Sequence, residues 1–162
     1  MTDCRAFRAG IAEVTRTAFA ERYGTGDSEA TLIDALRADG DVVVELAAVD
    51  GEDVVGHAMF SRAAPGYIAG LAPVSARIGR QGQGIGSALI RAGLQACTER
   101  GIGAVIVLGE PEYYGRFGFS VALAAPLACA FAGPHFQAME LEPGALAGVR
   151  AVEYARAFKA LG

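Results

Sequence analysis

Lysine and asparagine are almost missing from this 162-residue sequence, in which Lys159 is the one lysine and no asparagine occurs. Lysine and arginine together number 14, against 18 aspartates and glutamates, and the formal net charge is −4. No group of arginines forms a basic stripe of the kind that binding to phosphate backbones requires. We therefore expect no nucleic-acid partner, whereas a cationic substrate such as an amine is compatible with this charge.

Cysteine is scarce as well, and long apolar runs are missing. Cys4, Cys97 and Cys129 are odd in number and widely spaced, so the sequence indicates neither a disulfide framework nor a zinc site, and we expect no bound metal. Glycine, proline or charge interrupts each apolar run before it reaches membrane-spanning length, and no apolar signal-peptide run follows residues 1–5. The sequence thus predicts a cytoplasmic protein without a membrane partner.

The chain is organised around residues 71–108, which read as a strand, a glycine-containing loop, a helix and a second strand. The helix is indicated by apolar side chains that recur on one side, namely Ile85, Ala88, Leu89, Ala92 and Ala96. The run at 104–108 has no polar alternation, as in a strand that is covered on both faces. This pattern predicts a crossover that is right-handed.

The loop at residues 80–87 predicts an anion-binding site in front of the helix. The first N–H groups of a helix have no intrahelical acceptor and carry partial positive charge. Gly82, Gly84 and Gly86 remove side chains that would hold a ligand off these amides, so a phosphate or pyrophosphate can contact them directly. A Walker loop would need a lysine here, and a dinucleotide fingerprint would need Gly or Ala in place of Ser87.

Two segments one crossover apart resemble a known superfamily. Gln81-Gly82-Gln83-Gly84-Ile85-Gly86 resembles the acyl-CoA pyrophosphate loop of the GNAT N-acetyltransferases, Gln/Arg-x-x-Gly-x-Gly/Ala. The segment YYGRFGF at 113–119 resembles the aromatic-Tyr-x-x-x-Gly-Phe segment of the same superfamily. Within it, residues 107–114 and 136–146 resemble the YhbS-like group of predicted bacterial acetyltransferases, and the resemblance covers residues 32–148.

The resemblance implies an α/β fold with a mixed, mostly antiparallel central sheet, helices on both faces and a splayed strand pair around Val74 and Ile106. It also implies acetyl-CoA as co-substrate. The pantetheine arm would bind the backbone at Val74, Ser75 and Ala76. The pyrophosphate would bind the loop, at Gln81, Gly82, Gln83, Gly84, Ile85, Gly86 and Ser87. Relatives carry a basic residue where this chain has Gln83, and Arg77 or Arg80 can replace that phosphate contact.

The rest of the chain fits one domain, residues 1–162, which is long enough to bury roughly 70% of its unfolded surface. Helical spacing predicts a helix from residue 11 to about 23 and another that begins after Asp27 or Ser28 and stops at 39–40. Whether residues 4–7 form a strand before them stays open. The remaining predictions are an antiparallel meander at 42–49, 54–60 and 67–75, a helical turn at 111–116, strands at 127–131 and 137–141, and a helix at 149–161.

Acyl transfer to an amine requires stabilisation of the departing thiolate, and Tyr114 is the candidate for this role. A phenol of pKa about 10 can donate a proton to a thiolate whose conjugate acid has a pKa of about 8.5. The match of the 113–119 segment to the superfamily favours this role over a packing role for Tyr114. Tyr113 is expected to pack.

The general base is less defined by the sequence. Strand alternation makes Glu45 and His57 polar groups on mostly apolar strand faces, where each is either a base in a cleft or a structural group. Glu110 follows the strand at 104–108, at the end where open α/β sheets bind ligands. A base that acts through water is a further alternative. No cysteine and histidine lie close enough in sequence to indicate a covalent acyl-enzyme, so we expect direct transfer.

These observations predict an N-acetyltransferase that moves an acetyl group from acetyl-CoA to a primary amine. The main alternative is a non-catalytic acyl-CoA-binding sensor or regulatory module, and a Rossmann-type nucleotide binder is a distant third. The acceptor, whether a small molecule or a peptide amine, is not identified by the sequence. The oligomeric state is equally open, and a two-fold homodimer is the commonest arrangement for such enzymes.

Overall fold

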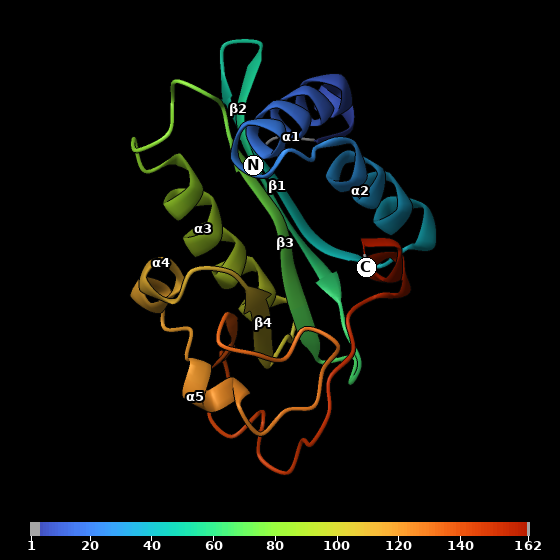
Figure 1. Cartoon of the computed structure of the whole chain (residues 1–162), viewed down its shortest axis with the longest axis vertical. Coiled ribbons are helices and arrows are strands. Elements are labelled where there is room, and N and C mark those ends of the chain that lie inside the picture. The colour runs from blue at the N-terminus through green and yellow to red at the C-terminus, as the bar shows by residue number, and fades with distance from the viewer. Residues whose placement is uncertain (1–3, 162) are drawn as a thin grey trace.

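The computed structural model describes residues 4–161 (Figure 1). Its helices and strands follow one another in the order η1 (Cys4–Phe7), α1 (Arg8–Tyr23), α2 (Asp27–Asp39), β1 (Val42–Asp50), β2 (Asp53–Arg62), β3 (Ile68–Ala76), α3 (Ile85–Glu99), β4 (Ala104–Leu108), α4 (Pro111–Tyr114), η2 (Gly115–Phe117), α5 (Val121–Ala124), β5 (Phe136–Glu140) and η3 (Arg156–Leu161). No helix within this range has the length and apolar character that crossing a membrane requires.

The five strands form one sheet in the order β1-β2-β3-β4-β5. β3 and β4 are parallel, and the other neighbouring strands are antiparallel. The parallel pair is connected through α3, as the crossover pattern requires. α3 lies on one face of the sheet, and α1 and α2 lie on the other (Figure 1). The predicted mixed, mostly antiparallel sheet with helices on both faces is therefore confirmed.

The two central strands separate partway along their length. Their pairing begins at Ile68↔Ala104 and ends at Leu71↔Val107, while β3 continues to Ala76. Pro73, just beyond the last pair, has no N–H to donate. The predicted splay is therefore present, but it begins beyond Val107; Ile106, the residue around which it was predicted, is still paired with Gly70.

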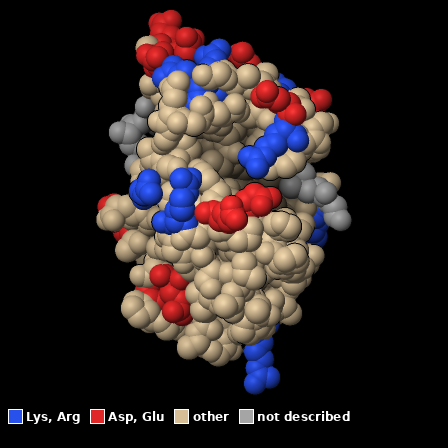
Figure 2. Space-filling model, turned by 60° about the vertical axis from the view of Figure 1, so that its left-hand side comes forward, with Lys and Arg blue, Asp and Glu red and all other residues tan. Residues whose placement is uncertain are grey.

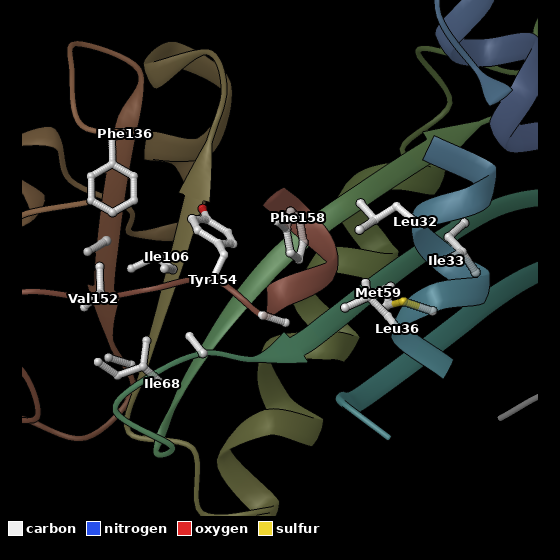
Figure 3. Packing of buried hydrophobic residues seen from close by; sticks show 14 of the residues in the cluster. Leu32, Ile33, Leu36, Met59, Ile68, Ile106, Phe136, Val152, Tyr154 and Phe158 are labelled. Carbon is white, nitrogen blue, oxygen red and sulfur yellow. The ribbon is translucent and has the colours of Figure 1, made fainter. Parts of the chain in front are cut away.

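Apolar side chains fill both sides of the sheet. On the α1/α2 side, Leu32, Ile33 and Leu36 of α2 belong to the same buried cluster as Met59 of β2, and Tyr154 and Phe158 extend this cluster (Figure 3). On the α3 side, the buried side chains come from α3, β2, β4 and the segment after η2, and include Leu89, Ile90, Phe60, Val105 and Phe119. The sheet is thus held between two apolar layers, with the splay at one end.

Two predicted elements differ from the structure, and one open question is answered. Residues 4–7, for which a strand was left open, form a 3-10 helix. The predicted strand at 127–131 is reduced to an isolated bridge between Ala128 and Ala151, after a short helix whose N-cap is Ser120. The predicted helix at 149–161 is helical only in η3. Residues 150–153 instead form backbone hydrogen bonds with Ala64 and Ala128, and these distant donors and acceptors replace the local partners that a helix would use.

Candidate functional site

The divergence of β3 and β4 opens a cleft of about 960 Å³, a volume in the range of ligand-binding sites. It is lined by residues of α1, α2, β3, the 80–87 loop, the first turn of α3, the end of β4 and α4. Figure 2 shows that basic and acidic side chains are interspersed around a hollow on this flank of the molecule. The cleft therefore does not present a surface of one charge sign.

The floor of the cleft at one end is the glycine loop in front of α3. Gly82 and Gly84 have φ of 81° and 80°, in the left-handed region, and Gly84 is the N-cap of α3. The N–H of Ala88 donates to the Gly84 carbonyl, so the amides at residues 85–87 precede the first hydrogen bond of the helix. These three residues line the cleft. The loop therefore directs a helix N-terminus with unpaired amides into the cleft, as an anion requires.

The loop residues predicted to contact a phosphate line this cleft, except for Gln83. The Gln83 side chain accepts a hydrogen bond from Arg80 Nε at 2.9 Å instead. Arg80 lines the cleft and also forms an ion pair with Asp50 at 3.1 Å, whereas Arg77 lies nearest to Glu13, at 3.9 Å. Of the two arginines considered as substitutes for a basic residue at position 83, Arg80 is the one in the cleft.

The β3 wall of the cleft contains Val74, Ser75 and Ala76, the residues whose backbone was predicted to bind the pantetheine arm. In the pairing with β2, His57 is opposite Ser75, and the N–H of Arg77 donates to Val55 two residues further on. Because hydrogen-bonding direction alternates along a strand, the backbone groups of Val74 and Ala76 point away from β2. The Ala76 carbonyl accepts from Gln81 Nε2 at 3.3 Å. The Val74 amide and carbonyl thus face the gap that β4 leaves.

Tyr114 forms part of the opposite wall, at the end of α4. Its ring meets Tyr113 edge-on at 5.0 Å and Phe119 edge-on at 5.8 Å between centroids. Gly109 leaves the space that the ring needs, since a Cβ at this position would lie 2.4 Å from Tyr114 Cε2. Burial raises the pKa of Tyr114 well above its usual range. The side chain is therefore a neutral phenol whose O–H group can donate a hydrogen bond.

Tyr113 does more than the packing expected of it. It lines the cleft, and its hydroxyl lies near the start of α3, because a Cβ on Gly86 would be 3.1 Å from it. The guanidinium of Arg116 lies over the Tyr113 ring at 4.6 Å and also lines the cleft. Neither contribution was predicted from the sequence, although both residues belong to the 113–119 motif.

Glu45 and His57, the two predicted bases, lie together but not among the residues that line the cleft. His57 is fully buried, and its Nε2 is 2.8 Å from Glu45 Oε2. Arg37 contacts both carboxylate oxygens, through Nη2 at 2.5 Å and Nε at 3.2 Å. Burial alone would raise the pKa of Glu45, but hydrogen bonds from His57 and Arg37 outweigh burial and lower it to about 2. Glu45 is therefore a paired carboxylate and a poor proton acceptor at neutral pH.

Among the acidic residues considered as bases, Glu110 is the one that reaches the cleft. Its Oε1 lies 4.0 Å from Nε2 of His135, and both side chains are largely exposed. Glu21 and Glu29 line another part of the cleft, beside Arg22 of α1. These helix residues carried no recognisable sequence signal, since each reads as an ordinary solvated side chain. Within residues 4–161, no three His, Cys, Asp or Glu side chains gather as a metal ion would require.

Known proteins resemble this chain in sequence and in structure. The Acetyltransferase (GNAT) family matches residues 8–119. The uncharacterized N-acetyltransferase YhbS of Escherichia coli K12 is 37% identical over 145 residues, which cover 85% of this chain and 87% of that protein. The crystal structure of Escherichia coli YhbS in complex with CoA has a TM-score of 0.85 at 36% identity, and covers 96% of this chain and 88% of that chain.

A GNAT family acetyltransferase from Brucella melitensis, solved in complex with acetyl-CoA, has a TM-score of 0.82 at 32% identity; the match covers 98% of this chain and 96% of that chain. These likenesses confirm the fold that the two motifs implied. The family match begins at residue 8, before the range 32–148 over which the resemblance was predicted, and the two structural matches cover 96% and 98% of the chain.

Proposed function

Because the chain belongs to the Acetyltransferase (GNAT) family, we propose that it moves an acetyl group from acetyl-CoA directly to a primary amine. The observation that carries this proposal is that one cleft joins the glycine loop at the start of α3, the unpaired edge of β3 and the Tyr114 phenol. These are an anion site, a strand edge for an amide-containing arm, and a proton donor. They suit, in turn, the pyrophosphate, the pantetheine and the thioester of acetyl-CoA.

The residues present fit acetyl-CoA. The amides at 85–87 suit the pyrophosphate, Arg80 adds a positive charge beside them, and the Val74 amide and carbonyl suit the pantetheine arm. Acetyl-CoA supplies the thioester that makes transfer favourable. Two structural neighbours, one solved in complex with CoA and the other with acetyl-CoA, support the same ligand.

Tyr114 is proposed as the group that protonates the departing thiolate. Burial keeps it protonated, and the ring is held between Tyr113, Phe119 and the Gly109 backbone, so the hydroxyl has a defined position. A positioned acid of this kind contributes roughly 10²–10⁴-fold to the rate. The interspersed charges of the cleft, with Glu21, Glu29 and Glu110 among its lining residues, support an amine as the acceptor, either a small molecule or a peptide amine.

The binding experiment is calorimetric titration with acetyl-CoA, CoA and NAD. We expect the wild-type protein to bind acetyl-CoA and CoA but not NAD. Replacing Gly84 by Ala and Gly86 by Val should weaken both affinities roughly tenfold or more, or about 1.4 kcal/mol, because Ala resists the positive φ and Val crowds Tyr113. Gly40→Ala is the matched control, since Gly40 has φ 74° at the end of α2 with open space around it. Absence of acetyl-CoA binding by the wild type would refute the proposal.

A non-catalytic acyl-CoA sensor is the second candidate, and one observation favours it. Neither Glu45 nor His57 lies among the cleft-lining residues, so neither of these predicted bases is in direct reach of an acceptor. Turnover of acetyl-CoA with a panel of small and peptide amines separates the two functions. Binding without turnover favours the sensor, and turnover that depends on the added amine favours the transferase.

A further inference from the structure

Three adjacent strands place a carboxylate, an imidazole and a hydroxyl on one face of the sheet. His57 of β2 is directly opposite Ser75 of β3, so their side chains are on the same face. Glu45 of β1 reaches His57 from the other side, with Oε2 at 2.8 Å from Nε2. These three residues lead in a line from the ion pair with Arg37 to the wall of the cleft, where Ser75 is a lining residue.

Among these three side chains, the hydrogen bond between His57 and Ser75 is missing. Since the ionised Glu45 can only accept, His57 Nε2 must donate to it, and Nδ1 of the neutral ring is left as an acceptor. Nδ1 is buried and has no hydrogen-bond partner among the described residues. The hydroxyl of Ser75 is likewise buried and without a partner in this part of the chain. A donor and an acceptor, each rarely left unpaired when buried, thus occupy facing positions on neighbouring strands.

We propose that Ser75, His57 and Glu45 form a proton relay that removes the proton of the acceptor ammonium from the cleft. The ammonium nitrogen gives a proton to Ser75 Oγ while the Ser75 hydroxyl proton passes to His57 Nδ1. The amine becomes neutral and nucleophilic, Ser75 is unchanged, and His57 becomes an imidazolium. This inference rests on the proposed function, and it connects the buried His57 ring to the cleft, which His57 itself does not line.

The separation and the rotamers of the two side chains allow this contact. Cβ atoms of directly opposed residues on antiparallel strands are roughly 4.5–5.5 Å apart, which a serine hydroxyl and an imidazole nitrogen can bridge. Ser75 has three staggered χ1 positions. In the relay, Ser75 adopts the χ1 position in which its hydroxyl proton points to His57 Nδ1 and an oxygen lone pair points to the cleft. In this chain Ser75 lines the cleft, its hydroxyl is buried, and the residue as a whole is 4% exposed.

The charged and polar groups around the His57–Glu45 pair come from several elements. Glu45 faces the ring from β1, and Arg37 of α2 holds that carboxylate in place by two contacts. Cys4 of η1 donates to the Glu45 backbone carbonyl at 3.6 Å. On α1, Thr15 is a buried neutral hydroxyl. Toward the end of β3 the charged neighbours form a separate ion pair, between Arg77 and Glu13, 3.9 Å apart.

In this relay Ser75 contacts the substrate. His57 and Glu45 do not contact the substrate and act through Ser75 as positioning residues. A merely structural role for this polar group would affect folding and acetyl-CoA binding but not the pH dependence of turnover. The relay predicts that the pH dependence of turnover changes, whereas folding and acetyl-CoA binding do not. The two roles are therefore separated by measuring affinity and pH dependence on the same variants.

The contact itself is tested by ¹⁵N NMR of the histidine side chains, which needs no turnover. The chain has two histidines, so assignment requires only a comparison with His135→Gln. We expect the wild-type His57 ring to carry its neutral-state proton on Nε2, and Ser75→Ala to shift the Nδ1 resonance without changing that tautomer. An Nδ1 resonance that is the same in wild type and Ser75→Ala overturns the relay.

The use of the contact is tested by the pH dependence of kcat/KM for an amine that the wild type acetylates. We expect His57→Gln and Ser75→Ala each to lower kcat/KM at pH 7 by roughly 10²-fold or more. We also expect His57→Gln to remove the acidic limb of the profile, which is the fall of kcat/KM toward low pH. The acetyl-CoA affinity should be unchanged. His135→Gln is the matched control and should leave the pH dependence intact. If His57→Gln fails to fold, the loss of activity in folded Ser75→Ala decides the outcome.

The two hypotheses fail in different ways. Wild-type turnover with an acidic limb that persists in His57→Gln overturns the relay and leaves the proposed function standing. Acetyl-CoA binding with no turnover of any amine by the wild type overturns the transferase, and the relay as a route for its proton, in favour of the sensor.

Discussion

Gly109→Ala should impair catalysis by moving Tyr114 without removing any group from it. A Cβ at position 109 would lie 2.4 Å from Cε2, 3.0 Å from Cδ2 and 3.5 Å from Cζ of the Tyr114 ring. Carbon atoms in contact are about 3.5 Å or more apart. The near edge of the ring must therefore move by about 1 Å, and the neighbouring rings of Tyr113 and Phe119 restrict how it can do so.

The size of the effect follows from that displacement. A misplacement of about 1 Å can cost about 10²-fold in rate, so we expect kcat to fall by about that factor. Overpacking should also cost roughly 1–3 kcal/mol of the free energy of unfolding. The glycine loop lies on another wall of the cleft, so the affinity for acetyl-CoA should change little.

The assay compares kcat, acetyl-CoA affinity and thermal unfolding of wild type, Gly109→Ala and Gly115→Ala. Gly115 directly follows Tyr114 and has φ −56°, and a methyl group added to it would meet no other atom within 4 Å, so its variant should behave as wild type. An unchanged kcat in Gly109→Ala, or an equal loss in Gly115→Ala, would refute the assignment of Tyr114 as a positioned acid.

Three further predictions concern single side chains. Tyr114→Phe should lower kcat about 10²-fold with little change in acetyl-CoA affinity, and an unchanged kcat would remove Tyr114 from the mechanism. Gly93→Ala should destabilise the fold by roughly 1–3 kcal/mol in chemical denaturation, because its Cβ would lie within 2.0 Å of Phe60; wild-type stability would contradict this packing. The pKa of Glu45 is lowered from 4.5 to about 2, so its contribution to stability is present above pH 4.5 and is lost as the pH falls toward 2. Unfolding free energies should therefore depend less on pH in that window for Glu45→Gln than for wild type, and equal slopes would count against the Glu45 ion pair.

The parts of the site that are contiguous in sequence could be predicted from it. The 80–87 loop and α3 follow from glycine spacing and helical period, and the turn containing Tyr114 follows from its aromatic motif. Each depends on contacts between residues close in the chain. The splay was also predicted, but the residue at which it starts depends on where the pairing of β3 with β4 ends, at Leu71↔Val107.

The grouping of Arg37, Glu45 and His57 could not be predicted in this way. Strand alternation correctly indicated that Glu45 and His57 are polar groups on apolar faces, but the third member lies on α2. Its contact with β1 depends on how that helix packs across the sheet. The apolar stretch at 127–131 failed as a strand for a related reason, since its backbone partners are at residues 150–152.

Several sequence predictions stay predictions, among them the single domain at 1–162, the cytoplasmic location, the lack of a nucleic-acid partner and the homodimer. The location, the partners and the homodimer concern the surroundings of the chain, and the domain prediction includes residues outside the described range 4–161. Gel filtration with light scattering would measure the mass in solution and so show whether the protein is a homodimer.

The segment at 150–158 affects how the protein is made. Its Glu153 backbone forms two hydrogen bonds with Ala64, its Tyr154 ring covers Gly70 in the middle of the sheet, and Arg156 forms an ion pair with Asp39, 117 residues earlier. While this segment is still inside the ribosome, α1 and α2 can already cover their part of this face of the sheet, but the sheet around Gly70 lacks its apolar cover. Packing of the face is therefore completed by long-range contacts after the last strand has emerged, and such contacts form more slowly than local ones.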